Sequence, residues 1–198
     1  VQTILQDNQF ISIEWSQFNI GKNETVEFLQ PSIDSVALNK ITSLNGSTIA
    51  GNLEANGTVI LVNPNGIIFT PDSKIDVGGL VASGLSIETD ISSINEKLNL
   101  FLNYNNAQCV IRNQGTIEAK NNGIALIGTN VVNTGTITSH VGQINLIAGK
   151  DAVISFSQNG LISVSLKKII EDAGEGVPSG DSIEGIVLLT EDQKQDIF

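Results

Sequence analysis

Cysteine, methionine, arginine and aromatic residues are scarce in this chain of 198 residues, and their shortage excludes several classes of structure and function. The chain has one cysteine, so no disulfide forms within it. One arginine and a formal net charge of −11 argue against nucleic-acid binding, because clustered cations hold phosphate backbones. No apolar run approaches the ~20 residues of a membrane-spanning helix.

The single cysteine and the single histidine do not resemble parts of a reactive site. Cys109 lies in the apolar run 107–111 with no histidine near it in sequence, so we expect a buried small side chain rather than a nucleophile. His140 lies beside the turn at Gly142 and has no neighbours at metal-ligand spacing, which predicts an exposed turn residue. The sequence therefore predicts no cofactor and no metal.

Isoleucine, valine and leucine are abundant, and glycine and asparagine divide them into short runs. Strand formers and turn formers in this ratio predict an all-β fold of many short strands. In the stretch 59–85 an apolar run stops at four residues that suit successive positions of a β-turn, and a second apolar run follows. The turn and the start of the next strand comprise Asn63, Pro64, Asn65, Gly66 and Ile67.

Internal repeats begin near residue 110. Asn113–Ile117 returns twenty residues later as Asn133–Ile137, and Gly123–Gly128 has a counterpart in Gly142–Gly149. A third, weaker copy starts at Asn159. A period near 20 to 25 residues with several short strands predicts a β-solenoid, in which stacked rungs bury the inward apolar side chains together.

The remaining segments depart from this repeat. Residues 86–106 have apolar spacing that fits a short helix or an irregular excursion from the core. Trp15 and Phe18 are three positions apart, so strand alternation predicts opposite faces. We expect one domain over residues 1–166, and residues 167–198 to be an acidic extension that leads toward a downstream part of a longer protein. Val1 resembles a strand interior, which suggests that a signal peptide was removed or omitted before it.

Several motifs in fixed order, from Trp15 to Gly149, carry a resemblance to a known family. Asn63–Ile67 and the motifs around it resemble the two-partner secretion domain, the amino-terminal domain of filamentous-haemagglutinin-like exoproteins of Gram-negative bacteria. The branch of high-molecular-weight adhesins is the most similar, because the extra Asn-Pro-Asn-Leu motif of the other branch is missing. The supporting residues are Trp15, Phe18, Asn19, Gly21, Gln30, Pro31, Asn39, Asn56, Gly57, Gly78, Gly79 and Ser83.

The resemblance implies a fold, a partner and a location. The fold is a right-handed parallel β-helix with short extra-helical strands, and it acts as the folding nucleus of a longer β-helix. The partner is an outer-membrane transporter with periplasmic POTRA domains, which recognises the domain and exports the exoprotein to the cell surface or the medium. We expect a monomer that is not an enzyme. Any contact with host cells belongs to downstream regions, whose activity would be that of an adhesin, a haemolysin or a toxin.

Other interpretations remain open at this stage. Asn63–Ile67 is either a contact for the transporter or a structural turn whose asparagines bond local backbone. The chain itself is alternatively an adhesin module that binds a carbohydrate or receptor, although its low aromatic content weighs against that. A polysaccharide hydrolase or lyase needs a cleft of paired carboxylates or bases. Asp72, Lys74 and Asp76 share one strand parity, and we expect a solvated strand face there.

Overall fold

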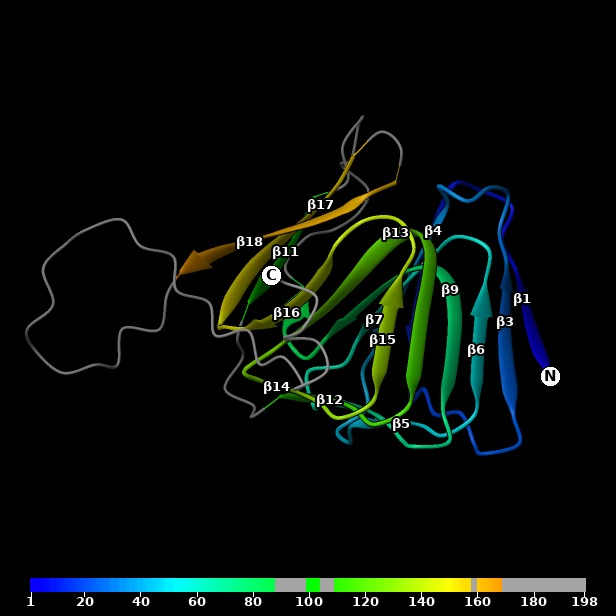
Figure 1. Cartoon of the computed structure of the whole chain (residues 1–198), viewed down its shortest axis with the longest axis horizontal. Coiled ribbons are helices and arrows are strands. Elements are labelled where there is room, and N and C mark those ends of the chain that lie inside the picture. The colour runs from blue at the N-terminus through cyan, green and yellow to red at the C-terminus, as the bar shows by residue number, and fades with distance from the viewer. Residues whose placement is uncertain (88–98, 104–108, 158–159, 169–198) are drawn as a thin grey trace, which may run out of the picture.

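The structure is a computed structural model that describes residues 1–87, 99–103, 109–157 and 160–168. Within those residues every helix or strand is a β-strand, and most strands stack in a coil of about six turns (Figure 1). In the same part of the chain, no helix has the length and apolarity needed to cross a membrane. The all-β solenoid predicted from the sequence is therefore confirmed.

Each turn of the coil contributes a strand to as many as three faces, and all pairs between turns are parallel. The first face contains β1 (Gln2–Leu5), β3 (Thr25–Leu29), β6 (Asn52–Ala55), the first half of β9 (Lys74–Ser83), the first half of β13 (Thr116–Gly128) and β15 (Thr136–Ser139). The second face contains β2 (Phe10–Trp15), β4 (Val36–Ile41), β7 (Thr58–Val62), the second halves of β9 and β13, and β16 (Ile144–Ala148).

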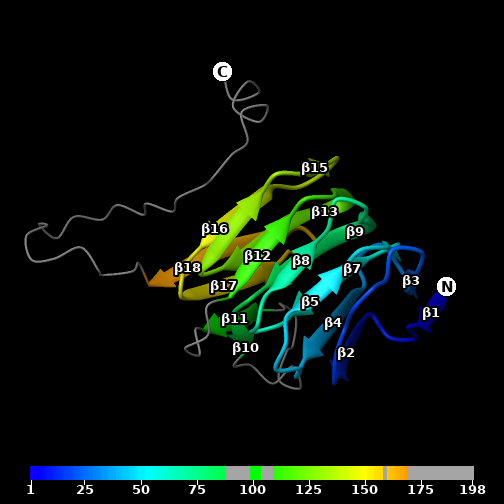
Figure 2. The same ribbon diagram turned by 90° about the horizontal axis from the view of Figure 1, so that it is seen from below.

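The third face consists of shorter strands, which lie side by side in Figure 2. Its strands are β5 (Ser47–Ile49), β8 (Ile67–Phe69), β12 (Val110–Asn113) and β14 (Asn130–Asn133), and a single bridge from Ile20 to Ile49 extends the face to the first turn. The repeats found in the sequence are successive turns of the coil. Asn113 pairs with Asn133, and Ile124 pairs with Ile144, as the twenty-residue period predicts.

The inside of the coil is the main hydrophobic core. Residues at equivalent positions of successive turns stack directly upon one another, as Leu53, Ile75 and Ile117 do on the first face. Each such side chain contributes about 1.5–3 kcal/mol by leaving water. A single turn has no facing layer to bury these side chains, so stability requires the stack.

A second hydrophobic core lies outside the coil, on the outer side of the second face. An antiparallel sheet covers that side and packs Leu100 and Ile154 against outward-pointing residues such as Ile60 and Val81. Because the middle of the second face is buried on both sides, β7 and the second halves of β9 and β13 are continuous apolar runs rather than alternating ones. The strands of the outer sheet are β10 (Ser86–Ile87), β11 (Asn99–Asn103), β17 (Asp151–Phe156) and β18 (Ile162–Lys168).

The outer sheet tests three predictions made from the sequence. Within 86–106 the described residues leave the coil and form β10 and β11, as the predicted excursion requires. The alternative, a short helix, falls mainly on residues 88–98 and 104–108, which lie outside the described part. Cys109 is buried in the outer core, as predicted. The prediction of a third repeat copy at Asn159 was wrong. Ile162 begins β18, which pairs antiparallel with β17 and adds no turn to the coil.

The prediction for Trp15 and Phe18 was also wrong. Their rings meet edge to face, with centroids 5.4 Å apart. Strand β2 ends at Trp15, so the alternation of a strand does not extend to Phe18. Phe18 is buried in the inner core, and Trp15 is half-buried against it. The domain boundary at residue 166 stays a prediction, because residues 169–198 lie outside the described part.

Candidate functional site

The turn Asn63–Gly66 connects β7 to β8, at the corner between the second and third faces. The backbone N–H of Gly66 donates to the carbonyl oxygen of Asn63 at 2.9 Å, which closes the predicted β-turn. The backbone N–H of Asn65 also donates to Oδ1 of Asn63 at 2.9 Å. The turn is thus fixed by both a backbone bond and a side-chain bond from its first residue.

Asn63 joins three successive turns of the coil. Its side chain is fully buried, and its Nδ2 donates to the carbonyl oxygen of Asn45 at 3.1 Å and to Oγ of Ser47 at 3.0 Å, both in the preceding turn. Its backbone N–H donates to the carbonyl oxygen of Ser83 in the following turn at 2.9 Å. Asn63 therefore satisfies its polar atoms inside the protein, and its contribution is structural.

Gly66 is required by its backbone conformation and by its surroundings. Its φ is +93°, in the region that side chains other than glycine rarely adopt. A Cβ atom there would lie 2.6 Å from the carbonyl oxygen of Val110, at the start of β12. Ile67, which follows, is fully buried in the inner core. Both residues therefore set how tightly the turn packs between its neighbours.

Asn65 and Pro64 are the members of the motif that face outward. Asn65 is exposed and Pro64 is half-buried. The Nδ2 of Asn65 donates to the carbonyl oxygen of Ser43 at 2.8 Å, so this side chain also holds the loop of the preceding turn. The motif consequently divides into a buried structural part, Asn63 with Ile67, and an exposed part that a partner can reach.

A second group of predicted residues forms the corner between the first and second faces. Asn56 bonds the backbone of Gln30 twice, by donating to its carbonyl oxygen and accepting from its N–H, each at 2.8 Å. Gln30 in turn accepts from the N–H of Gly57 at 2.8 Å. A Cβ on Gly78 would lie 2.7 Å from the carbonyl oxygens of Asn56 and Gly57, so glycine there allows the corners to stack.

Gly79 and Pro31 complete this corner. A Cβ on Gly79 would lie 2.8 Å from Oγ1 of Thr58 and from Cβ of Asn122. Asn122 belongs to the same corner and escaped sequence analysis. Its Nδ2 donates to Oγ1 of Thr58 at 3.0 Å and to the carbonyl oxygen of Ile33 at 2.9 Å, which spans several turns of the coil. Pro31 is exposed at the end of β3.

A third group lies in the first two turns. Nε1 of Trp15 donates to Oδ1 of the buried Asn39 at 2.9 Å, and Nδ2 of Asn39 donates to the carbonyl oxygen of Ile60 at 3.2 Å. Oδ1 of Asn19 accepts from the N–H of Thr48 at 2.8 Å.

Two further predicted residues have local structural contacts. The N–H of Gly21 donates to Glu24 at 2.8 Å within a tight turn. Ser83 is buried, and its Oγ accepts from the N–H of Leu85 at 3.0 Å. The predicted residues therefore lie at separate corners of the coil and do not converge on one cleft.

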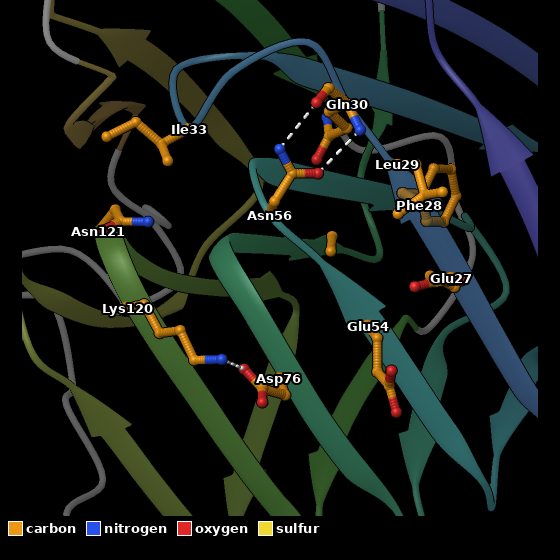
Figure 3. Close-up of a pocket in the computed structure, with 11 residues that line it drawn as sticks. Glu27, Phe28, Leu29, Gln30, Ile33, Glu54, Asn56, Asp76, Lys120 and Asn121 are labelled. Carbon is orange, nitrogen blue, oxygen red and sulfur yellow. Dashed lines mark hydrogen bonds and ion pairs between the residues drawn. The ribbon is translucent and has the colours of Figure 1, made fainter.

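The described part of the chain also has a surface groove of about 510 Å³ over the first face (Figure 3). Glu27, Glu54 and Asp76 line it and stack on successive strands of the first face. Lys120 points toward Asp76 and forms an ion pair with it at 2.5 Å. This hydrogen bond, with the surrounding carboxylates, raises the pKa of Lys120 above its usual 10.5.

The groove agrees with a solvated strand face rather than a catalytic centre. Asp72 is exposed and pairs with Lys22 at 3.1 Å, and Asp76 is paired with Lys120. Lys74 is exposed. Among the described residues no group of histidine, cysteine and carboxylate side chains has the arrangement of a metal site. His140 is exposed, as predicted, and its Nε2 lies 2.7 Å from Oε1 of Glu118.

Comparisons with known proteins agree with this architecture. The family model described as the TPS secretion domain matches residues 1–197. A heme/hemopexin-binding protein of Haemophilus influenzae strain Rd is 38% identical over 171 residues, which cover 83% of this chain and 19% of that protein. Another heme/hemopexin-binding protein of Haemophilus influenzae is 43% identical over 86 residues, which cover 43% of this chain and 9% of that protein.

A solved structure of a secretion domain is similar to this one. The HMW1 secretion domain from Haemophilus influenzae superposes with a TM-score of 0.68 at 34% identity, over 79% of this chain and 41% of that one. The chain thus spans about a fifth of the first heme/hemopexin-binding protein and under half of the HMW1 chain.

Proposed function

This chain belongs to the family of TPS secretion domains, and we propose on that basis that a cognate outer-membrane transporter with periplasmic POTRA domains recognises it and exports the exoprotein that carries it. The route runs through the periplasm to the cell surface or the medium. The observation that carries the proposal is the family match over residues 1–197, together with a coil whose corners are built by residues such as Asn63, Gly66 and Gly78.

The edges of the coil suggest how export proceeds. In the described part of the chain β14, β15 and β16 each pair on one side only, so their other edges offer unpaired backbone groups. An edge of this kind accepts a further strand by β-augmentation, and we assign that strand to the next turn of the exoprotein. Turns that fold one after another outside the cell would hinder backward movement of the chain.

We assign no enzymatic activity to this domain. Glycoside hydrolysis uses two carboxyl groups on either side of a sugar. Here Asp76 is paired with Lys120 and Asp72 with Lys22, on a solvated face. The adhesin alternative is weaker as well, because Trp15 is engaged with Phe18 and Asn39 rather than presented to a ligand.

The names of the relatives raise the question of heme or hemopexin binding. We assign any such activity to parts of the exoprotein beyond this chain. Protein ligands of heme iron are histidine, cysteine, methionine and tyrosine. The sequence has no methionine and one histidine, which is bonded to Glu118, and Cys109 is buried in the outer core. The one tyrosine, Tyr104, lies outside the described residues.

The test is secretion of the full-length exoprotein in cells with and without its cognate transporter. We expect release into the medium only when the transporter is present. A matched exoprotein that lacks residues 1–168 but keeps its signal peptide should stay in the cell in both strains. Release of that truncated form by the transporter would show that recognition lies elsewhere in the exoprotein.

A further inference from the structure

The loop of residues 42–46, which we name the Leu44 loop, lies directly before the turn Asn63–Gly66 in the stack of corners. It connects β4 to β5 in the second turn of the coil. We propose that Leu44 is the side chain through which this corner contacts the transporter, an inference that rests on the function proposed above. The turn Asn63–Gly66 then has a defined task, which is to hold the Leu44 loop in its binding conformation.

Leu44 is an unusual residue for the surface on which it lies. The residue is 91% exposed, and apart from the terminal Val1 none of the described large hydrophobic residues is more exposed. Single exposed apolar side chains are common on proteins and by themselves carry no function. The reason to single out Leu44 is the way in which the backbone on both sides of it is fixed.

The carbonyl groups on either side of Leu44 are each held by an asparagine of the turn. Nδ2 of Asn65 donates to the carbonyl oxygen of Ser43 at 2.8 Å, and Nδ2 of Asn63 donates to that of Asn45 at 3.1 Å. The N–H of Asn45 also donates to Oγ of Ser43 at 3.0 Å. The loop that carries Leu44 is therefore ordered before any partner arrives.

The same loop is pressed against the turn at its end. A Cβ on Gly46 would lie 2.8 Å from the carbonyl oxygen of Asn65, so the two backbones are in close contact. A loop that is already ordered loses less conformational entropy on binding than a flexible one. This pre-organisation turns one exposed leucine into an effective anchor for a partner.

The chemistry of the corner specifies the partner surface. Residues 42–46 and 63–67 contain no charged side chain, although the chain carries a formal net charge of −11. The centre of a protein interface is depleted of charge and the rim is polar. We therefore expect a neutral, apolar pocket for Leu44 on the periplasmic part of the transporter, bordered by groups that bond the exposed amide of Asn65.

The experiment measures the initial rate of secretion of the full-length exoprotein at limiting transporter concentration. We expect Leu44→Ser to lower apparent affinity for the transporter by roughly tenfold to a hundredfold, the effect of no longer burying one leucine. Leu44→Met should retain most secretion. Val141→Ser is the matched control, because Val141 is also exposed, at 51%, in a loop of the last turn of the coil. A photo-crosslinker at position 44 should trap the transporter, and one at position 141 should not.

The possible outcomes separate this inference from the proposed function. If wild-type secretion does not require the transporter, the proposed function fails and the role of Leu44 fails with it. If secretion requires the transporter but Leu44→Ser matches Val141→Ser, only the role of Leu44 is overturned. Asn65→Ala keeps the leucine but frees the carbonyl of Ser43, so it should also slow secretion. Normal secretion of Asn65→Ala beside a defective Leu44→Ser would mean that the leucine is recognised in an unfolded chain, which contradicts presentation by the folded corner.

Discussion

Replacement of Asn63 by alanine should destabilise the fold much more than the same replacement of Asn65. The Asn63 side chain makes three hydrogen bonds, to the N–H of Asn65, the carbonyl of Asn45 and the hydroxyl of Ser47. A hydrogen bond contributes about 0.5–1.5 kcal/mol net, and a buried partner left without one costs more than an exposed one. After the replacement, the buried hydroxyl of Ser47 is left without this hydrogen bond, whereas the carbonyl of the exposed Asn45 bonds water instead. We therefore expect a loss of about 2–4 kcal/mol in the free energy of unfolding.

Asn65→Ala is the matched control, since it removes the same side chain from the same turn. Asn65 is exposed and its side chain makes one bond, to the carbonyl of Ser43, so the loss should stay below about 1 kcal/mol. The assay is equilibrium unfolding of the purified chain in urea, followed by the fluorescence of Trp15 and by circular dichroism. Equal losses in the two variants would refute the division of the motif into buried and exposed parts.

Three further predictions concern other parts of the fold. Gly66→Ala should cost at least about 2 kcal/mol in the same unfolding assay, because the new Cβ meets a backbone oxygen at 2.6 Å and φ is +93°; an unchanged midpoint would contradict the close packing of the turn. Trp15→Phe should cost about 1–3 kcal/mol, measured by circular dichroism, because it leaves Oδ1 of the buried Asn39 without its donor. Lys120→Gln should cost less than about 1 kcal/mol at pH 7, since its pair with Asp76 is half-exposed. Because the pKa of Lys120 is raised, this contribution is complete below about pH 10.5 and is lost as pH rises through the folded-state pKa, so the variant and the parent should converge in urea unfolding at higher pH.

The coil was predictable because its signals are local and periodic. Asn113–Ile117 and Asn133–Ile137 are equivalent segments, and equivalent segments of a solenoid pair in register. The turn at Asn63 was predictable for a similar reason, since proline, asparagine and glycine suit successive turn positions. Both predictions depend on residues within one period of the chain.

The outer sheet was not predictable, because its pairing joins distant segments. Leu100 pairs with Ile154 and Ile154 with Val164, and nothing in the local pattern of β18 distinguishes it from another turn of the coil. Trp15 and Phe18 show the same limit on a smaller scale. Their contact depends on where β2 ends, and sequence alternation assumes that a strand continues.

The turn Asn63–Gly66 was predictable from the sequence, but which of its two asparagines is buried was not. Asn63 and Asn65 are the same residue type two positions apart, yet one is buried and the other exposed. Their bonds to the carbonyls of Asn45 and Ser43 come from the preceding turn, some twenty residues earlier. Only the stacking of turns brings these groups together, so the fixed and exposed position of Leu44 is visible in the structure alone.

The most direct measurement of the central claim is export of a passenger protein by this chain. The 198-residue chain, with a signal peptide before it and an unrelated soluble passenger after it, would be produced with and without the cognate transporter. If the chain is a secretion domain, we expect the passenger in the medium only when both the chain and the transporter are present. Release without the transporter, or retention of the folded fusion with it, would contradict the assignment of transporter recognition to this chain.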